Sequence, residues 1–145
     1  MDNYHFSHTL VLLTYKRADL FEARFNELFN FYRNRRQVEL LVIDNGSTGA
    51  ATRLTIDSCR TKNEEWIRKH DTANTWFVHI RRIEQNRGFA EGMNHGLHHA
   101  FGKVVHLLSD DVRVYGDFVR RVDQAVHVDS SALYAAEIIN WRAGW

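Results

Sequence analysis

The sequence predicts an open, doubly wound α/β fold with a mostly parallel sheet. Segments of strand character alternate with segments of helical periodicity along the chain, and this order places helices on both faces of a parallel sheet. Residues 8–14 and 38–44 are mostly apolar with little polar alternation, which is typical of strands buried on both faces. The chain has 145 residues, of which 44% are hydrophobic, so we expect one folded domain over residues 1–145.

The first helix follows the first strand closely. Asp19 and Glu22 have the spacing of a capping box, in which Asp19 caps the helix. With residues 38–44 as the next strand, the first unit is βαβ. Large apolar residues in this helix recur on one face and are expected to pack into the core: Phe21, Phe25, Leu28, Phe29 and Tyr32.

The middle of the chain continues the alternation. Residues 45–49 are typical of a turn, and Ser47 or Thr48 is expected to cap a helix that ends near Arg60. The polar residues 61–73 predict a short helix or a surface loop. Residues 75–81 then return to strand character.

The last third begins with a helix over residues 89–101. We expect Met93, Leu97 and Ala100 on its core side. Gly92 and Gly96 lie one turn apart and allow a close approach to the sheet, although each costs about 1 kcal/mol relative to Ala. The remaining elements are predicted as a strand over 103–108, a helix over 117–127 and a strand over 132–139.

Composition excludes several classes of protein. A net charge of +1 gives no broad basic field for nonspecific nucleic-acid binding. Every apolar run is far shorter than the ~20 residues that cross a bilayer, so no membrane span is expected. Cys59 is the single cysteine, which excludes an intrachain disulfide and a zinc site built on several cysteines. Because no secretory signal pattern opens the chain, we expect a cytoplasmic protein.

Polar residues stand at the ends of four predicted strands. In open α/β sheets, ligands bind outside the carboxyl ends of the strands. Each group alone is typical of a turn or a cap, but four at successive strand ends predict a binding site. The groups are Thr14-Tyr15, Asp44-Asn45, Asn86-Arg87-Gly88 and Ser109-Asp110-Asp111.

The common nucleotide and zinc motifs are missing from these segments. Gly88, Gly92 and Gly96 have GxxxG spacing rather than G-x-G-x-x-G, and Lys103 enters a strand instead of opening a helix. His95 and His99 are four residues apart, but no Glu follows His95 as in metalloprotease helices. We interpret these histidines, with His98, as a solvated helix face.

A family resemblance joins the four groups. The segments Leu13-Thr14-Tyr15-Lys16-Arg17, Val42-Ile43-Asp44-Asn45-Gly46-Ser47-Thr48, Asn86 to Gly96 and Leu107-Leu108-Ser109-Asp110-Asp111-Val112 resemble, in order and spacing, the signatures of family 2 glycosyltransferases of the GT-A fold. The resemblance covers residues 8 to about 115. It implies a GT-A-like domain that ends before the acceptor side of the family's fold.

The resemblance also implies roles for individual residues. Asp44 would accept a hydrogen bond from the base, with uracil or thymine favoured, and Thr14-Tyr15 would line the base and ribose. Asp111 falls on the second Asp of the family's D-x-D pattern and would hold Mn²⁺ or Mg²⁺, while Ser109 replaces the first Asp. The nucleotide-sugar site implied in this way comprises Thr14, Tyr15, Arg17, Asp44, Asn45, Arg87, Gly88, Asn94 and Asp110.

These observations leave two main readings of function. The first is an inverting, metal-dependent transfer of a sugar from a nucleotide donor to a saccharide, lipid or protein acceptor. The second is a noncatalytic or partner-dependent nucleotide-sugar-binding module, because the family's catalytic base and most acceptor contacts follow the matched region. A nucleotidyltransferase is weaker, because residues 14–17 contain no glycine. Trp141 and Trp145 could also mediate a homo-oligomer.

Overall fold

A four-stranded parallel sheet in the order β3-β2-β1-β4 forms the centre of the fold. The structure is a computed structural model that describes residues 5–70 and 77–127. The predicted strand over 132–139 and the two C-terminal tryptophans lie outside these residues. The strands are β1 (Phe6–Thr14), β2 (Val38–Asn45), β3 (Phe77–Ile83) and β4 (Gly102–Ser109).

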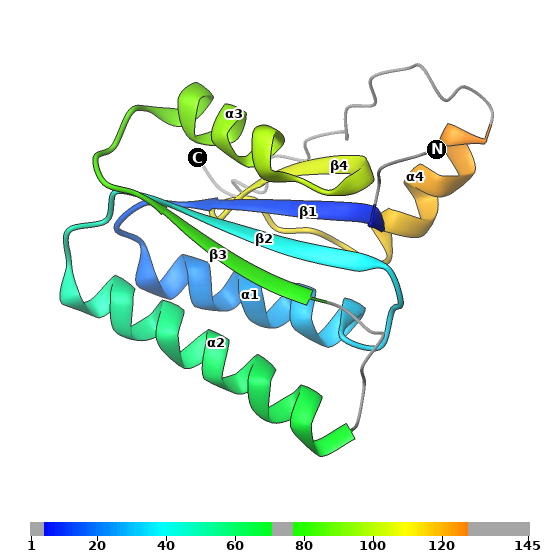
Figure 1. Cartoon of the computed structure of the whole chain (residues 1–145), viewed down its shortest axis with the longest axis horizontal. Coiled ribbons are helices and arrows are strands. Elements are labelled where there is room, and N and C mark those ends of the chain that lie inside the picture. The colour runs from blue at the N-terminus through cyan, green and yellow to red at the C-terminus, as the bar shows by residue number, and fades with distance from the viewer. Residues whose placement is uncertain (1–4, 71–76, 128–145) are drawn as a thin grey trace, which may run out of the picture. The chain divides into compact units, whose positions relative to one another are not determined.

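Helices cover both faces of this sheet, as the sequence predicts. Helices α1 and α2 lie on one face and α3 lies on the other (Figure 1). By its internal contacts, the chain divides into a first unit that ends at Val114 and a second that begins at Tyr115. The sheet and three helices belong to the first unit: α1 (Ala18–Tyr32), α2 (Ala50–His70) and α3 (Phe89–His99).

Helix α4 (Phe118–Val126) belongs to the second unit. The side chain of Asp117 caps it by accepting a hydrogen bond from the Arg120 amide at 3.2 Å. Within residues 5–70 and 77–127, no helix combines the length and apolar character needed to cross a membrane.

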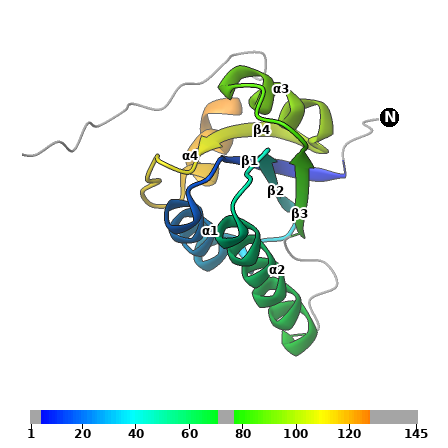
Figure 2. The ribbon, with the colours of Figure 1, turned by 90° about the vertical axis from the view of Figure 1, so that its left-hand side faces the viewer.

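The register of the strands brings their carboxyl ends to one edge of the sheet. Thr14 pairs with Asp44, and Leu13 pairs with Ser109. Figure 2 faces this edge, where the loops after β1, β2 and β3 gather. We call it the carboxyl edge, and the opposite end of the sheet the amino edge.

Buried side chains fill the space on each face of the sheet. The predicted stripe of α1 is confirmed, because Phe21, Phe25, Leu28, Phe29 and Tyr32 are all at most 3% exposed. On the opposite face, residues from β1 and β2 form a cluster with α3: Val11, Leu13, Leu41, Ile43 and Met93.

Two glycines explain how closely α3 lies on the sheet. A Cβ atom at Gly96 would lie 2.4 Å from Cγ1 of Val11, and one at Gly92 would lie 2.7 Å from Cδ1 of Leu13. At Gly96 a larger residue would push the helix away from the strands, because the short side chain of Val11 cannot move aside; at Gly92 the end of Leu13 would have to shift. The prediction that these glycines permit a close approach is confirmed.

Several local predictions were wrong. Neither Ser47 nor Thr48 caps α2: the Gly49 carbonyl accepts the first helical bond, from the Arg53 amide at 3.5 Å, and the Ser47 hydroxyl accepts from the Lys16 amide. The capping box fails because α1 begins earlier: the Arg17 carbonyl accepts the first helical bond, from Phe21 at 2.9 Å, and Asp19 already lies in the first turn. Helix α2 does not end near Arg60 but continues to His70, since Trp66 packs edge-on against Phe29.

A further error concerns Leu97, which was expected in the core. It is 43% exposed, whereas Met93 and Gly96 are buried. One helical residue turns the side chain by about 100°, so Leu97 points away from the face that Gly96 presents to β1.

Candidate functional site

The end of β4 carries a buried carboxylate, Asp110. The Thr14 hydroxyl donates to Oδ2 of Asp110 at 2.7 Å, and the Asp110 amide donates to the Leu13 carbonyl at 3.2 Å. Burial raises the pKa of Asp110, and the charge of Asp111 adds to this effect while the Thr14 hydrogen bond opposes it. Asp110 therefore ties the end of β4 to the end of β1.

The neighbouring Asp111 faces solvent instead. Its side chain is 53% exposed, and its Oδ2 lies 3.6 Å from Nη1 of Arg17, which is 54% exposed. Two adjacent aspartates thus have different surroundings, as expected for residues that leave a strand on opposite faces.

A divalent cation at this edge would have few protein ligands. Among the residues that the structure describes, no three His, Cys, Asp or Glu side chains form a cluster for a metal. Mg²⁺ is commonly held by one or two carboxylates together with substrate phosphates. A single exposed carboxylate such as that of Asp111 is compatible with that mode, but not with a metal held by protein ligands alone.

The end of β2 is shaped by Asp44, which is 2% exposed. Its Oδ1 accepts a hydrogen bond from the Ser47 amide at 2.9 Å. The Ser47 hydroxyl in turn accepts one from the Lys16 amide at 2.9 Å. These bonds fix the loop after β2 against the loop after β1.

Gly46 lets this loop approach the next one. It has a φ of +77°, and a Cβ there would lie 2.4 Å from the Asn86 backbone nitrogen. Only a residue without a side chain fits this position. The loops after β2 and β3 therefore touch through their backbones.

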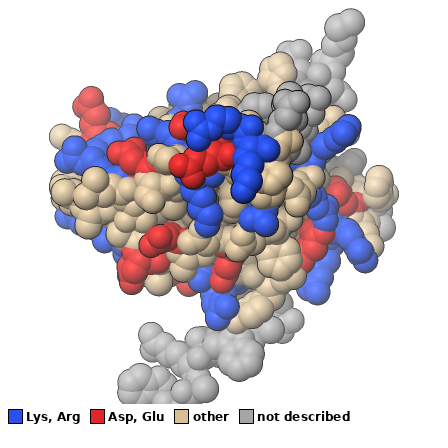
Figure 3. All heavy atoms as spheres, turned by 90° about the horizontal axis from the view of Figure 1, so that it is seen from below, with Lys and Arg blue, Asp and Glu red and all other residues tan. Residues whose placement is uncertain are grey.

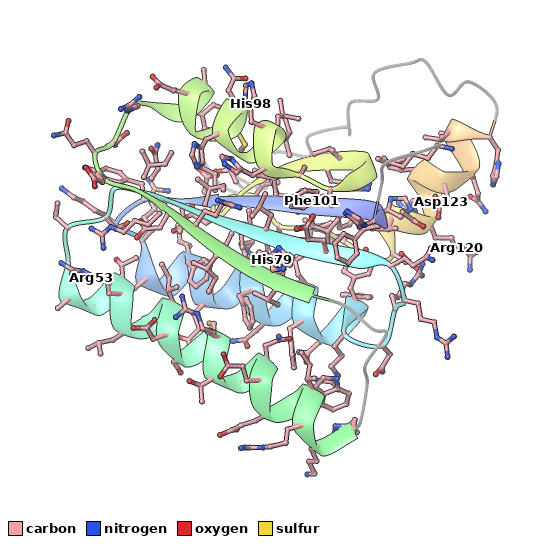
Figure 4. All side chains as sticks on the ribbon, viewed as in Figure 1. Arg53, His79, His98, Phe101, Arg120 and Asp123 are labelled. Carbon is pink, nitrogen blue, oxygen red and sulfur yellow. The ribbon has the colours of Figure 1, made fainter. Side chains whose placement is uncertain are left out.

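A small cavity of about 140 Å³ lies beside Asp44, between α2 and β3. Arg82 donates from Nη2 to the Ser47 carbonyl at 2.8 Å and so joins β3 to the loop after β2. Figure 4 labels Arg53 at the start of α2. The residues that line the cavity are Asp44, Arg53, Ile56, Asp57, Arg60, Ile80 and Arg82.

The arginines of this cavity were missed by sequence reasoning. Arg53 and Arg60 are seven residues apart, so they share one face of α2, and Arg82 pairs with Asp44 across the strands. That spacing was the available signal. Over the face covered by α1 and α2, basic and acidic side chains are intermixed and form no single broad basic patch (Figure 3).

Asn45 joins β2 to the loop before α3. It is 3% exposed, and its Nδ2 donates to Oδ1 of Asn86 at 3.2 Å and to the Gly88 carbonyl at 3.0 Å. The Gly88 amide donates to the same Asn86 oxygen at 2.7 Å. Gly88 has a φ of +88°, which favours glycine.

The other predicted residues differ in how they face this edge. Tyr15 is half-buried, and hydrogen bonds from Lys16 and Asn86 lower the pKa of its phenol. Arg87 is exposed and pairs with Glu91 at 2.9 Å.

Asn94 lies apart from the other predicted site residues. It is exposed on the second turn of α3. Its side chain makes no hydrogen bond to any other residue that the structure describes. The structure thus places nine of the ten predicted residues at the ends of β1, β2 and β4 or in the loops after the strands. Asn94 lies on the adjacent helix α3.

Comparison with known proteins gives one matching family and several related structures. The model of the family described as "Glycosyl transferase family 2" matches residues 9–141. No curated protein matches the chain significantly.

Two of the related structures carry ligands. The mannosyltransferase PcManGT from Pyrobaculum calidifontis, in complex with GDP-Man and Mn²⁺, is 24% identical with a TM-score of 0.55, over 72% of this chain and 27% of that one. TarS 1-349 from S. aureus, in complex with UDP, is 17% identical with a TM-score of 0.64, over 86% of this chain and 33% of that one. The chain therefore spans a third or less of these structures, and the likeness establishes the fold.

Proposed function

The chain belongs to glycosyl transferase family 2, and from this membership we propose that its carboxyl edge binds a nucleotide-sugar donor whose sugar it transfers to an acceptor. The fold is of the GT-A type, a parallel α/β sheet with helices on both faces. We propose UDP- or dTDP-sugars as donors, an inverting displacement as the reaction, and a divalent cation as cofactor.

The observation that carries this proposal is the spacing of two carboxylates along one edge. Asp44 is the penultimate residue of β2, Asp111 lies in the turn after β4, and β1 lies between these strands. Adjacent strands are about 4.8 Å apart, so the two strand ends are separated by roughly 10 Å. That separation suits a ligand with a base at one end and a diphosphate at the other, extended across the end of β1.

The surroundings of each residue suggest how it would serve the donor. Oδ1 of Asp44 is already bonded to Ser47, so Oδ2 is the oxygen we assign to an N–H of the base. The Thr14 hydroxyl is bonded to Asp110, so Thr14 contributes backbone surface and Tyr15 its ring. Asn45 and Asp110 position the loops.

The remaining assignments concern the diphosphate and the sugar. We assign Arg17, Arg87 and Gly88 to the phosphates and Asn94 to the border of the sugar. Asp111 would hold Mn²⁺ or Mg²⁺, and such an ion neutralises charge that develops on a diphosphate leaving group. No residue is assigned as the base that deprotonates the acceptor.

A thermal-shift panel tests donor binding. UDP, dTDP, GDP and their sugars are compared, each with and without Mn²⁺. We expect a uridine or thymidine diphosphate with Mn²⁺ to give the largest shift, because a ligand at ~100 times its Kd stabilises the folded state by about 2.7 kcal/mol. Negligible shifts for every nucleotide under both conditions would contradict the proposal.

A second candidate, a donor-binding module that needs another segment or chain for transfer, is favoured by one observation. The chain covers 27% and 33% of the two ligand-bound structures. Without a positioned base, transfer would lose the ~10² to 10⁴ in rate that general-base catalysis supplies. Turnover over a broad acceptor panel separates the two: slow donor hydrolysis alone supports the module, and rapid transfer supports a complete enzyme.

A further inference from the structure

An exposed ion pair stands at the carboxyl edge, between the loop after β1 and the turn after β4. It joins Nη1 of Arg17 to Oδ2 of Asp111 at 3.6 Å. This separation exceeds the ~2.7 to 2.9 Å of a charge-assisted hydrogen bond. Both side chains are about half exposed, and such pairs contribute little because water solvates each charge well. The pair is therefore easy to break.

The backbones that carry this pair are held firmly. On one side, Asp110 is buried and bonded to Thr14 and to the Leu13 carbonyl. On the other side, the Lys16 amide bonds to Ser47 and the Arg17 carbonyl starts α1. Fixed attachment points with solvated tips allow the two side chains to change partners without moving the fold.

We propose that Asp111 exchanges partners when the donor binds: it releases Arg17 and takes the divalent cation, and the released guanidinium binds the donor diphosphate. This inference rests on the proposed function. Asp110 is committed to Thr14 and Ser109 is neutral, so Asp111 is the one exposed carboxylate in the described sequence from Gly102 to Asp111. A dication on this carboxylate would repel the nearby guanidinium, because both are positive, and this repulsion favours breaking an ion pair that is already long.

The chemistry of arginine suits the second half of the exchange. A guanidinium binds a phosphate through two parallel N–H···O bonds, which a lysine cannot do. Arg17 lies beside the carboxylate to which the diphosphate would be linked by the cation, so the released side chain has its new partner within reach. Arg17 would then compete with the cation in the free protein and assist the donor in the complex.

This double role predicts effects of opposite sign in one variant. Binding of Mn²⁺ is followed by the EPR signal of the free ion, and binding of UDP at saturating Mn²⁺ by calorimetry. For Arg17→Ala we expect Mn²⁺ alone to bind about two- to fivefold more tightly, because Arg17 no longer competes with the ion for Asp111 and an exposed ion pair is weak. We expect UDP with Mn²⁺ to bind at least about tenfold more weakly, as loss of a charged hydrogen bond requires.

Arg113→Ala is the matched control. It removes the same charge two residues from Asp111, but Arg113 pairs with Glu27 at 3.4 Å, so neither affinity should change appreciably. Arg17→Lys is the second variant. It should keep the competition with Mn²⁺ and lose part of the UDP affinity, because the charge remains without the planar fork.

The outcomes separate this inference from the function on which it rests. Opposite shifts for Arg17→Ala support the exchange. Shifts of the same sign, or no shift in either affinity, overturn it while wild-type binding of UDP leaves the proposed function standing. If the wild type does not bind UDP with Mn²⁺, both proposals fall.

Discussion

The two edges of the sheet each contain a buried carboxylate, but the groups around these carboxylates differ. At the amino edge, Glu39 is 0% exposed, and its Oε2 accepts hydrogen bonds from the Thr9 hydroxyl at 2.7 Å and the Phe101 amide at 3.2 Å. His79 lies 2.8 Å from the other oxygen. Figure 4 labels His79 on β3 and Phe101 just before β4. The Glu39 carboxylate on β2 thus contacts Thr9 on β1 and His79 on β3. It reaches β4 through Thr9, whose hydroxyl oxygen accepts a hydrogen bond from the Gly102 amide at 2.8 Å.

At the carboxyl edge, buried Asp44 and Asp110 also join strands to loops, but exposed charges stand beside them. Asp111, Arg17 and Arg87 are all about half exposed or more. Buried polar bonds of this kind hold a backbone in place, and exposed charges next to a fixed backbone are available to a ligand. We therefore expect the amino edge to contribute chiefly to stability, and we propose the carboxyl edge as the binding edge.

The largest expected effect breaks the amino edge. Glu39→Ala should lower the free energy of unfolding by about 2 to 5 kcal/mol. The buried Thr9 hydroxyl loses its acceptor, which costs about 1 to 3 kcal/mol, and the contacts of the carboxylate with His79 and the Phe101 amide are lost as well. Urea unfolding measures the change. UDP affinity of the folded fraction should stay as in the wild type, and a large loss of affinity at unchanged stability would mean that the two edges are not separate in function.

The next effect concerns the carboxyl edge. Asp44→Asn keeps an oxygen for the Ser47 amide but replaces the second oxygen with an NH₂ group, which cannot accept an N–H of the base. UDP affinity should fall by about 1.5 to 3 kcal/mol, the contribution of a hydrogen bond to a charged group. Calorimetry measures the affinity, and the melting temperature serves as the control. A variant that melts much lower while its folded fraction binds UDP normally would show that Asp44 is a structural cap.

The fold could be predicted from the sequence where apolar residues form a long run or recur along one face of a helix. Continuous apolar strands and the α1 stripe identified the layers correctly, because burial of that much apolar surface leaves few alternatives. Helix α2 was cut short at Arg60, since its second half is polar and is held by a contact that the pattern does not contain, between Trp66 and Phe29.

The candidate site could be predicted from the sequence only as a set of strand ends. The motifs located the loops, but the sequence did not indicate that Asp110 turns inward to Thr14 while Asp111 turns outward to Arg17. The role of Glu39 was missed as well, because one acidic residue in an apolar strand gives no sign of its partners. Those partners, at positions 9, 79 and 101, come together only through the strand order.

The smallest effect compares the two edges by their response to acid. Burial alone would raise the pKa of Glu39, but hydrogen bonds from His79, Thr9 and the Phe101 amide outweigh burial and hold this pKa below its usual value. The pKa of Asp110 is raised, chiefly by burial.

A lowered pKa stabilises the fold above the unfolded value, about 4.3 for Glu, and that stability is lost as the pH falls through the folded value. A raised pKa does the opposite: the folded state is penalised at neutral pH, and the penalty is relieved as the pH falls through the folded value toward about 3.9. Relative to Glu39→Gln, the wild type should therefore lose stability below about pH 4.3, and relative to Asp110→Asn it should gain stability between neutral pH and about 3.9. Urea unfolding of the three proteins across this range gives both differences, and slopes of the same sign would mean that the two carboxylates are not held in opposite ways.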